Sequence, residues 1–539
     1  MFARLLTTLG VAVLTSGLLA ATPAAAKWRR AETEHFIAFA DLSKDELESR
    51  VERLERFDAL MRKLLNVEET VKVQVFILPS LSDVQELANN RNVGGFYNAS
   101  AQLAYGFVPA KFSFNQEGYT PEAVSMHEYT HHMLLGGIDR YVPMWATEGL
   151  ATLFMTARLD DDGGITVGAP NPAFSTAMYS GSRWSIEKLL KSDKDEIGKS
   201  ERIELYTRGW ALAHYLWLSG KRPGQYAKFI KLLNESGDAL SAGREAFGDL
   251  DKLNSEVNAY LRRGSFPVSK LTGKQLDAST EISVRELTEG EEAILEYRMR
   301  SLLGVDKERS VKLADEARPI GMRFPDDPFV QRTMTEIEYD AAHLNDDLGF
   351  EAAETAADRA LASDPENLMA MTYKGRIFAQ RAIEQDSPEL MTEARNWFLR
   401  ANKVDPNHPL PFELYYDTFV AQGSTPPSDA VNGLFRSTVL MPQDSSLRMK
   451  AAIELIRLGD ISRARSVLAP AAFYPHVSDD NPMRKIIAKI DEDVSPTELI
   501  DWIHEEKHDQ RINAYLSAKI LQEDEEKEDQ EKDGGESKE

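Results

Sequence analysis

Two short segments near the start of the chain have strand composition, and the stretch between them is amphipathic with a helical period. Residues 34–41 and 71–78 are rich in aromatic and β-branched residues. Residues 44–65 between them place apolar side chains at the spacing of one helix face: Leu47, Val51, Leu54, Phe57, Leu60, Met61 and Leu65. The pattern predicts a strand, a helix and a second strand. Another strand is predicted at residues 101–108, where Pro109 would end the strand or mark it as an edge.

Helix signals follow this predicted strand. Residues 120–122 (Thr-Pro-Glu) form a helix opening, because Thr caps a helix start, Pro fits the first position and an acidic side chain is favourable in the first turn. The helix is predicted to run to Leu135 and to stop at Gly136–Gly137. Pro143 is predicted to open the next helix, and residues 206–218 predict a further apolar one.

Helical segments recur with similar punctuation in the second half of the chain. Prolines occur at intervals of 40, 41 and 36 residues: Pro325, Pro365, Pro406 and Pro442. These intervals are somewhat longer than the roughly 34 residues of a tetratricopeptide unit. Residues 290–515 resemble degenerate tetratricopeptide repeats, which stack into a solenoid with a concave surface. An unrelated helical bundle is the alternative. Residues 263–289, which contain Gly-Ser-Phe-Pro, are interpreted as a linker between domains.

Composition limits the class of protein and its partners. A chain of 539 residues is too long for one ordinary core, so two or three domains are expected. The formal net charge of −24 argues against nucleic acid and anionic membrane surfaces as partners. Residues 523–539 alone hold ten acidic residues and three lysines, and residues 516–539 are predicted to be a disordered acidic tail. The chain has no cysteine, so a metal site must use histidine and carboxylate ligands.

Residues 1–26 have the features of an export signal. Arg4 precedes an apolar run over residues 5–21, and the alanines of residues 24–26 form an A-x-A cleavage site. A cleaved signal peptide predicts an exported protein, periplasmic or secreted. The alternative is an uncleaved anchor, because the apolar run is near the lower length limit for a membrane span. No later apolar run approaches that length, so we expect no membrane span after cleavage.

The strongest candidate for chemistry lies in the predicted helix at residues 120–135. His127 and His131 are four residues apart, so both project from one helix face, and Glu128 lies beside them. A following helix can deliver Glu148 as a third ligand. Two histidines and a glutamate are the ligands of hydrolytic Zn2+ sites, which keep one position for water. The sequence therefore predicts Zn2+ on His127, His131 and Glu148, with Glu128 as general base. Two core histidines beside a surface acid are the alternative.

A second H-E-x-x-H match runs from His504 to His508. Charged residues stand between its histidines, as on a solvated helix face. The residues around the first match are uncharged, as a helix buried beneath a metal requires. Three other histidines, His35, His132 and His214, are predicted to be structural rather than metal ligands.

The first match is followed by residues 145–151, with the pattern Trp-x-x-Glu-Gly-x-Ala. This combination resembles the gluzincins, zinc peptidases with a glutamate as third ligand, and especially the peptidase MA-like family of exported bacterial proteins. Residues 206–216 are similar to the Tyr-x-Lys-Gly segment of aminopeptidase N relatives, which implies that Tyr206 stabilises the transition state. The resemblance implies an α+β zincin-like metallopeptidase domain over residues 27–262, followed by the all-α tetratricopeptide-like solenoid.

Two departures from these relatives bear on specificity. Sixteen residues separate His131 from Glu148, fewer than in aminopeptidase N relatives, which implies a shorter turn between the helices. The Gly-x-Met-Glu-Asn motif that binds a substrate amine there is absent, so an endopeptidase is expected rather than an amine-anchored exopeptidase. The predicted edge strand at 101–108 would align the peptide, with Leu103 and Tyr105 as substrate-binding residues.

The sequence therefore predicts an exported zinc endopeptidase. Its substrate would be a peptide or protein, and the repeats would bind substrate or a protein partner. One alternative is a repeat-based binding or scaffold protein with an inactive or structural metal domain. The other is zinc hydrolysis of a non-peptide amide, because such a reaction uses the same ligands.

Overall fold

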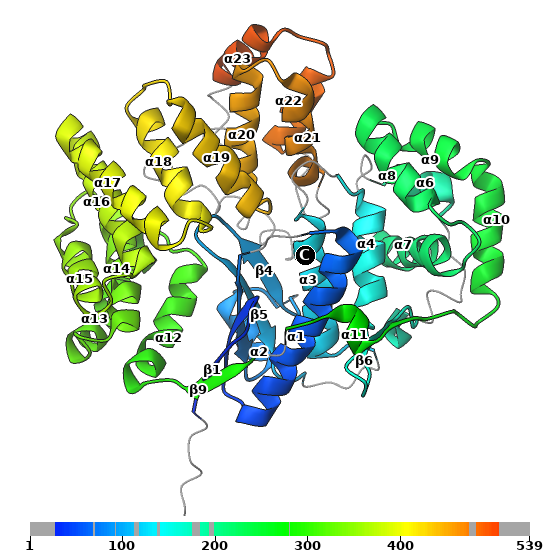
Figure 1. The fold of residues 1–539 in the computed structure, drawn as a ribbon, viewed down its shortest axis with the longest axis horizontal. Coiled ribbons are helices and arrows are strands. Elements are labelled where there is room, and N and C mark those ends of the chain that lie inside the picture. Colours follow the sequence, from blue (N-terminus) through cyan, green and yellow to red (C-terminus); the bar gives the residue numbers. More distant parts are fainter. Residues whose placement is uncertain are drawn as a thin grey trace, which may run out of the picture.

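The computed structural model describes residues 27–67, 71–91, 93–112, 118–136, 141–174, 184–192, 199–279, 281–473 and 481–505. The fold is mixed α/β, with a small central sheet, helices around it and a long series of helices after it (Figure 1). The predicted signal peptide and the predicted acidic tail lie outside the described residues. Among the described helices, none combines the length and the apolar character needed to cross a membrane.

A six-stranded sheet has the order β4-β5-β3-β2-β1-β9. β2, β3 and β5 run parallel, whereas β1, β4 and β9 pair antiparallel with their neighbours. Its strands are β1 (Arg29–Glu32), β2 (Phe36–Ala40), β3 (Val73–Leu78), β4 (Phe96–Ala99), β5 (Ala104–Pro109) and β9 (Ser283–Glu286). A smaller sheet, β6-β7-β8, consists of β6 (Arg158–Leu159), β7 (Ile165–Val167) and β8 (Ser269–Leu271).

Helix α1 covers Lys44–Leu65, the range predicted from the amphipathic pattern. Ser43 and Glu46 form a capping box at its start, and Asn66 ends it in the left-handed conformation. The other helices before the last strand are α2 (Leu81–Leu87), α3 (Pro121–Leu134), α4 (Met144–Phe154), α6 (Ile186–Leu190), α7 (Lys199–Leu218), α8 (Gln225–Ser236), α9 (Ala239–Phe247), α10 (Leu250–Leu261), α11 (Gly273–Leu276) and the 3-10 helix η1 (Pro172–Phe174).

Alternate residues of the central strands face opposite layers. Phe36 and Val75 belong to the large core that also contains the inner faces of α1 and α3. Phe39, Phe76 and Phe107 belong to a second core on the other face. These three rings form a stack across neighbouring strands, with centroids 5.2 and 4.9 Å apart. Burial on both faces explains why the central strands contain few polar residues.

The structure corrects the prediction that residues 101–108 form an edge strand. β5 lies between β3 and β4, and β4 is the strand at the edge of the sheet. β4 has only four residues, Phe96–Ala99, which is too short for alternation to reveal a strand in the sequence. Pro109 ends β5, which was one of the two expectations for it.

The structure also corrects the interpretation of residues 263–289 as a linker. β8 pairs with β7 in the small sheet, and β9 pairs with β1 at the edge opposite β4. Arg29 pairs with Glu286 in that ladder and also contacts it through their side chains, across 257 residues of sequence. Local composition could not reveal a strand whose partner is so distant.

Helices α12 to α23 form the helical array, residues 289–505. The prolines at 325, 365, 406 and 442 occupy equivalent positions, each two residues after one helix ends and three before the next begins. The regularly spaced prolines therefore mark the turns of a repeated helix–turn–helix unit. The helices are α12 (Glu289–Leu302), α13 (Lys307–Arg323), α14 (Pro328–His343), α15 (Glu351–Ser363), α16 (Leu368–Glu384), α17 (Pro388–Val404), α18 (Pro409–Ala421), α19 (Ser428–Leu440), α20 (Ser445–Arg457), α21 (Ile461–Ala472), α22 (Pro482–Ile490) and α23 (Pro496–Glu505).

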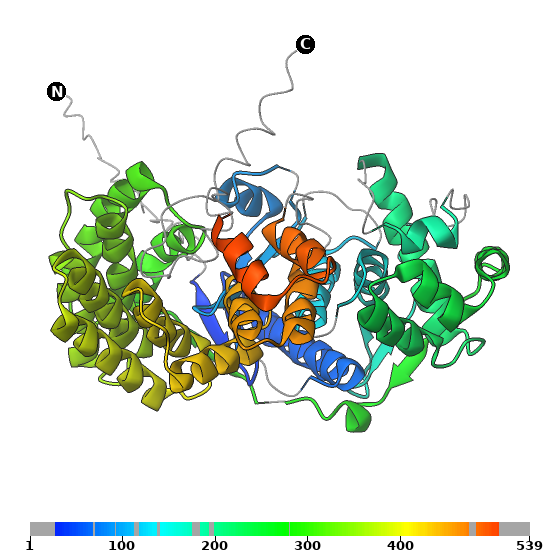
Figure 2. The ribbon, with the colours of Figure 1, turned by 90° about the horizontal axis from the view of Figure 1, so that it is seen from above.

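The helical array bends back onto the sheet and its helices (Figures 1 and 2). Its first helix, α12, covers the aromatic stack with Leu295 and Met299. In α16, the Tyr373 hydroxyl accepts a hydrogen bond from Gln102 at 3.3 Å. The largest hydrophobic core contains residues of the sheet and its helices together with residues of α16 to α23, whereas the buried apolar residues of α12 to α15 belong to smaller cores. The two halves of the chain therefore share one core.

Candidate metal centre

Helix α3 positions two of the predicted ligands. Thr120 caps its start by accepting a hydrogen bond from the Ala123 amide, and Pro121 occupies the first turn. Tyr129 and Met133 pack into the core beside the sheet. Tyr129 and Met133 follow His127 by two and six residues, so they point to another side of the helix than the histidines do. His127 and His131 therefore face α4.

Helix α4 carries the third predicted ligand, Glu148, and packs closely on α7, which carries Tyr206. A β-carbon built on Gly149 would lie 2.4 Å from the Gly209 carbonyl carbon. One built on Gly209 would lie 2.5 Å from the Trp145 carbonyl oxygen. Neither contact is possible, so both positions require glycine for the helices to approach this closely. The glycines next to Glu148 and after Tyr206 thus have a physical role in bringing these two side chains to one site.

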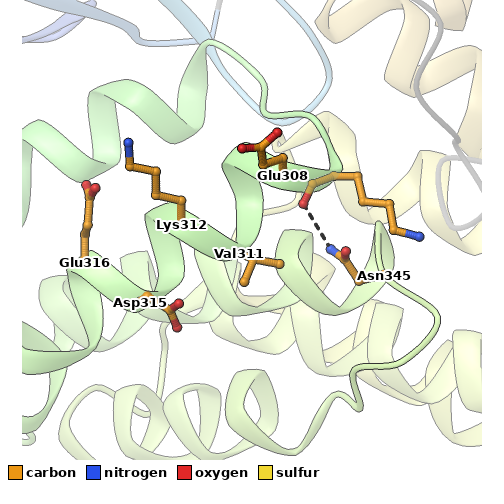
Figure 3. Close-up of a pocket in the computed structure, with 7 residues that line it drawn as sticks. Glu308, Val311, Lys312, Asp315, Glu316 and Asn345 are labelled. Atoms are coloured by element: carbon orange, nitrogen blue, oxygen red, sulfur yellow. Dashed lines mark hydrogen bonds between the residues drawn. The ribbon is translucent and has the colours of Figure 1, made fainter.

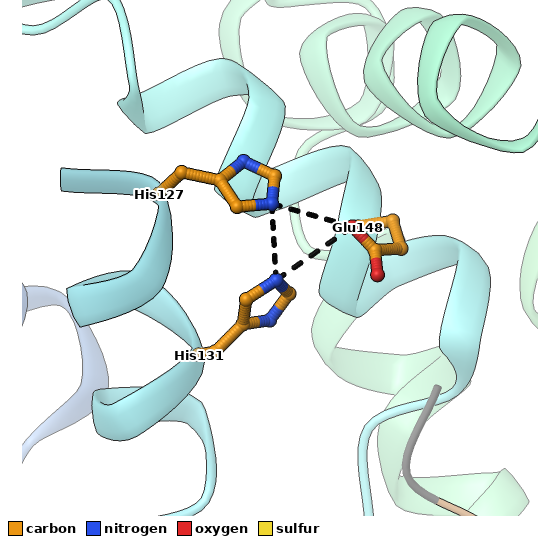
Figure 4. Close-up of side chains that lie close together, drawn as sticks. All are labelled: His127, His131 and Glu148. Atoms are coloured by element: carbon orange, nitrogen blue, oxygen red, sulfur yellow. Dashed lines mark hydrogen bonds and ion pairs between the residues drawn. The ribbon is translucent and has the colours of Figure 1, made fainter. Parts of the chain in front are cut away.

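The structure brings His127, His131 and Glu148 together in the ligand cluster (Figure 4). The two imidazole Nε2 atoms are 3.1 Å apart, and Glu148 Oε2 lies 3.5 and 3.6 Å from them. Ligand atoms about 2.0–2.1 Å from a tetrahedral ion are about 3.3–3.4 Å from one another. The three atoms therefore have the spacing of three corners of a zinc tetrahedron. Both Nε2–Oε2 distances also exceed the usual N–H···O range of about 2.7–3.2 Å.

The ligand cluster is buried and negatively charged. The side chains of Glu148, His131 and His127 are 1%, 2% and 18% exposed. Burial lowers the pKa of His127, but the Glu148 carboxylate and the charge of Glu128 outweigh burial, so this pKa is raised above its ordinary value. A site that favours positive charge on an imidazole also favours a divalent cation.

Two further groups act on the ligand cluster. The Tyr206 ring lies edge-on to the His127 ring, with centroids 6.2 Å apart. Burial, followed by the charge of Glu148, raises the pKa of Tyr206, so its hydroxyl stays protonated and can donate a hydrogen bond. Glu128 is half-buried beside His127, and its charge raises the pKa of both His127 and Tyr206. The candidate base and the candidate donor are therefore both within electrostatic reach of the ligands.

Tyr119 is a neighbour of Glu128 that has no signal in the sequence. Burial and the charge of Glu128 raise the pKa of Tyr119. A β-carbon on Gly94, just before β4, would lie 2.7 Å from the Tyr119 hydroxyl. This tyrosine therefore occupies the space between the start of the edge strand and α3. Only the fold reveals this position, since Gly94 and Tyr119 are distant in sequence.

The structure contradicts the assignment of Leu103 and Tyr105 as substrate-binding residues. The Tyr105 hydroxyl donates a hydrogen bond to the Leu302 carbonyl at 2.5 Å, and its ring lies in the core covered by α12. Leu103 precedes β5 in a tight turn closed by Ser100 and packs against the same core. Both residues are therefore committed to packing on the far face of the sheet. Strand composition alone does not determine which face a residue occupies.

Two of the histidines predicted to be structural have protein partners in the core. His132 Nδ1 is hydrogen-bonded to the Tyr97 hydroxyl. Burial, with the charge of Arg62, lowers the pKa of His132 to about 3, so the ring is neutral. His214 lies 2.9 Å from a backbone carbonyl through Nε2 and 2.9 Å from the Tyr260 hydroxyl through Nδ1. The structural prediction is confirmed for both.

His35 belongs to a second group of ligand-type side chains, the acidic network, with Glu55 and Asp58. His35 Nδ1 lies 2.8 Å from Glu55 Oε2 and 3.2 Å from Asp58 Oδ2. Arg62 Nε and the Tyr129 hydroxyl each donate to Asp58 at 2.6 Å. The acidic network thus ties α1 to α3 by hydrogen bonds, and His35 contacts two carboxylates of α1 within it.

The second H-E-x-x-H match begins on α23, where His504 is exposed. Its remaining residues from 506 onward lie outside the described part of the chain. A surface hollow elsewhere in the helical array is lined by Lys307, Glu308, Val311, Lys312, Asp315, Glu316 and Asn345 (Figure 3). Its side chains are mostly charged, with alternating sign, as on a solvated helix face. None of its lining residues belongs to the ligand cluster, so neither feature adds to the candidate site.

No protein-family model and no curated protein matches this chain. What the chain does must therefore be inferred from its own residues. Among the described residues, the ligand cluster combines ligand spacing, burial, a neighbouring carboxylate and a protonated tyrosine. We take it as the candidate metal centre.

Proposed function

We propose that this chain is an exported zinc-dependent endopeptidase of the gluzincin type, related to the peptidase MA-like family. The observation that carries the proposal is the tetrahedral spacing of His127 Nε2, His131 Nε2 and Glu148 Oε2. Zinc held by two histidines and a glutamate keeps one position for water. The signal-like residues 1–26 support export to the periplasm or beyond. The α+β part is then zincin-like, and the helical array is a tetratricopeptide-like solenoid.

The residues around the ligand cluster supply the proton transfers. Zinc, when bound, lowers the pKa of a water ligand to about 7 and polarises a carbonyl oxygen. Glu128 accepts the proton of the attacking water and passes it to the leaving amine, as a general base and then a general acid. The Tyr206 hydroxyl, protonated because its pKa is raised, donates a hydrogen bond to the carbonyl oxygen as negative charge develops there. Base and donor come from different helices, α3 and α7.

We assign substrate binding to β4 instead of β5. β4 is the last strand of the described sheet, so its outer edge has main-chain groups for another strand. Tyr97 of β4 is hydrogen-bonded to His132, the residue after the ligand His131. An extended peptide added along Phe96–Ala99 would therefore run beside the metal helix. Main-chain pairing of this kind suits an endopeptidase, because it requires neither chain end of the substrate.

A repeat-based scaffold protein is the runner-up, and the contacts of the helical array argue against it. The array uses α12, α16 and the start of α20 to bind the N-terminal part of its own chain. Surfaces occupied in this way are closed to an external partner. Hydrolysis of a non-peptide amide uses the same ligands and becomes one outcome of the test below.

The test compares wild-type protein with Glu128→Gln by zinc content and by cleavage of casein and a peptide library. Wild type should hold one zinc per chain and cleave peptides in a chelator-sensitive way. Glu128→Gln should keep zinc and lose about 10²- to 10⁴-fold in activity, because it cannot accept the proton. Glu122→Gln, in the first turn of α3 and partly exposed beside Arg50, is the matched control and should keep both.

Three outcomes would redirect the proposal. Unchanged cleavage by Glu128→Gln would exclude Glu128 as the base. One zinc per chain without cleavage of any peptide would favour the scaffold protein. Cleavage of small amides but no peptide would favour the amidase.

A further inference from the structure

The ligand His131 lies in the last turn of α3, where a helix runs out of internal hydrogen-bond partners. α3 ends at Leu134, with Leu135 as its cap residue. The Leu135 and Gly136 amides donate to the His131 and Met133 carbonyls at 3.1 Å, while the remaining carbonyls at a helix end need donors from elsewhere. Helix ends are also the parts that open most readily. The position of His131 therefore depends on the contacts that hold the C-terminal end of α3.

The helical array supplies donors to this helix end. Gln443 Nε2 donates to the His132 carbonyl at 3.1 Å, and Arg448 Nη2 donates to the Leu135 carbonyl at 3.1 Å. These partners are 311 and 313 residues apart in sequence. A guanidinium at a helix C-terminus also interacts favourably with the helix dipole. The end of the metal helix is therefore capped by α20 and the turn before it.

Arg448 is fixed before it reaches the metal helix. Its guanidinium donates through Nε to the Pro442 carbonyl at 2.5 Å and through Nη1 to the Val467 carbonyl at 2.8 Å. The residue is fully buried. A buried group held at two points loses little further freedom when it makes a third contact. Arg448 is thus a rigid support rather than a flexible surface side chain.

Asp444 extends the same contact to the edge strand. One carboxylate oxygen caps α20 by accepting from the Ser446 and Leu447 amides, at 2.8 and 3.1 Å. The other accepts from the Ala101 amide at 2.7 Å. Ala101 lies in the turn that joins β4 to β5. One short segment of the helical array therefore contacts both the end of the metal helix and the turn after β4.

We propose that residues 443–448, the clamp segment, position the metal helix and the edge strand relative to each other. Gln443, Asp444 and Arg448 are positioning residues, since they act through His132, Leu135 and Ala101. The helical array then helps to hold the metal ligands in position. The inference rests on the proposed function, because it assigns the clamp segment to the same zinc site.

The first test measures zinc affinity by chelator competition in the full-length protein, for Arg448→Met and Gln443→Glu. The glutamate of Gln443→Glu keeps the size but cannot donate to the His132 carbonyl. The zinc dissociation constant should rise about 10- to 100-fold for Arg448→Met, as for other residues that orient metal ligands, and less for Gln443→Glu. Amides of the last turn of α3 should exchange hydrogen faster in both variants. If Arg448→Met fails to fold, Gln443→Glu decides the question.

The second test pairs Asp444→Asn with Asp460→Asn. Asparagine at 444 keeps an oxygen to cap α20 but replaces the oxygen that accepts from the Ala101 amide. Asp460 is exposed and caps α21 by accepting from the Arg463 amide, so it is a cap of the same chemistry away from the clamp segment. Asp444→Asn should lower kcat/KM about 10- to 100-fold through misplacement of the strand, while Asp460→Asn should leave it unchanged.

Folded Gln443→Glu and Asp444→Asn proteins with wild-type zinc affinity, exchange rates and kcat/KM would overturn the clamp proposal. Lower melting temperatures without a selective change of hydrogen exchange in α3 would also overturn it, because they would indicate only a general loss of stability. Failure of the proposed function would look different, because wild type itself would then bind no zinc or cleave no substrate. Exchange in the last turn of α3 can still be compared in that case, so the two failures are distinguishable.

Discussion

The acidic network and the ligand cluster contain similar side chains, yet their charges are balanced in different ways. In the acidic network, His35 lies 2.8 and 3.2 Å from two carboxylates, and Arg62 lies 2.6 Å from Asp58. In the ligand cluster, the Glu148 carboxylate lies 3.5 and 3.6 Å from two imidazoles, the spacing of a metal's ligands. In the acidic network an arginine of the protein itself contacts a carboxylate, whereas in the ligand cluster the carboxylate faces two imidazoles at longer distances. Residue type therefore does not define a metal site; the distances and the source of positive charge do.

Removing one carboxylate from each group should have very different effects on zinc binding. Glu148→Gln should abolish tight zinc binding, because a direct ligand contributes more than the about 10- to 100-fold of an orienting residue. Asp58→Asn should keep one zinc per chain. Zinc content after dialysis against a weak chelator measures both. Equal loss of zinc from the two variants would mean that the groups do not act separately.

For the free energy of unfolding we expect the opposite order: the change at Asp58 should have a larger effect than the change at Glu148. Asp58→Ala removes a carboxylate that is 1% exposed and contacts Arg62, so the free energy of unfolding should fall by about 3–5 kcal/mol. Glu148→Gln should lower it less in the metal-free protein, because the lost buried carboxylate lies 3.5 and 3.6 Å from its imidazole neighbours, farther than Asp58 lies from Arg62. Denaturant unfolding of both metal-free proteins checks the order. A larger loss from Glu148→Gln would indicate that the ligand cluster is also a structural network.

Zinc affinity and the stability of the metal-free protein should also depend weakly on pH. The pKa of His127 is raised, so protonation of His127 stabilises the metal-free fold below the ordinary histidine pKa, and this contribution is lost as pH rises through the raised value. Zinc binding has the opposite sign, since it requires the neutral imidazole. Zinc affinity should therefore fall as pH drops through the raised pKa of His127.

Titration of zinc affinity and of the metal-free melting temperature over this range measures both trends. His132, with a pKa of about 3, stays neutral throughout and should contribute to neither. A zinc affinity that is constant across the range would contradict the assignment of His127 as a ligand.

The parts of the fold that depend on near neighbours in sequence could be predicted. The apolar spacing over residues 44–65 gives α1, and the Thr-Pro opening gives α3. His127 and His131 share a face because helical geometry places residues four apart on one side. Glu148 could be predicted as their partner because it lies on the next helix along the chain, after one connecting segment.

The parts that depend on distant pairing could not be predicted. Tyr105 has strand composition, but its face depends on the register of β5 between β3 and β4. The strand β9 is recognisable only beside β1, and the clamp segment only beside α3. The regular spacing of Pro325, Pro365, Pro406 and Pro442 indicates a series of helices but not what these helices contact. Each of these features needs the whole chain in three dimensions.

The position of β9 late in the sequence affects both the folding of the sheet during synthesis and the behaviour of shortened fragments. During synthesis, β1 cannot pair with β9 until residue 286 has left the ribosome. A fragment that stops at residue 262 leaves β1 with a bare edge and the Phe39–Phe76–Phe107 stack without α12. Bare strand edges and apolar surfaces both promote aggregation. An expression fragment meant to retain an intact sheet must extend at least through Leu302, the end of α12.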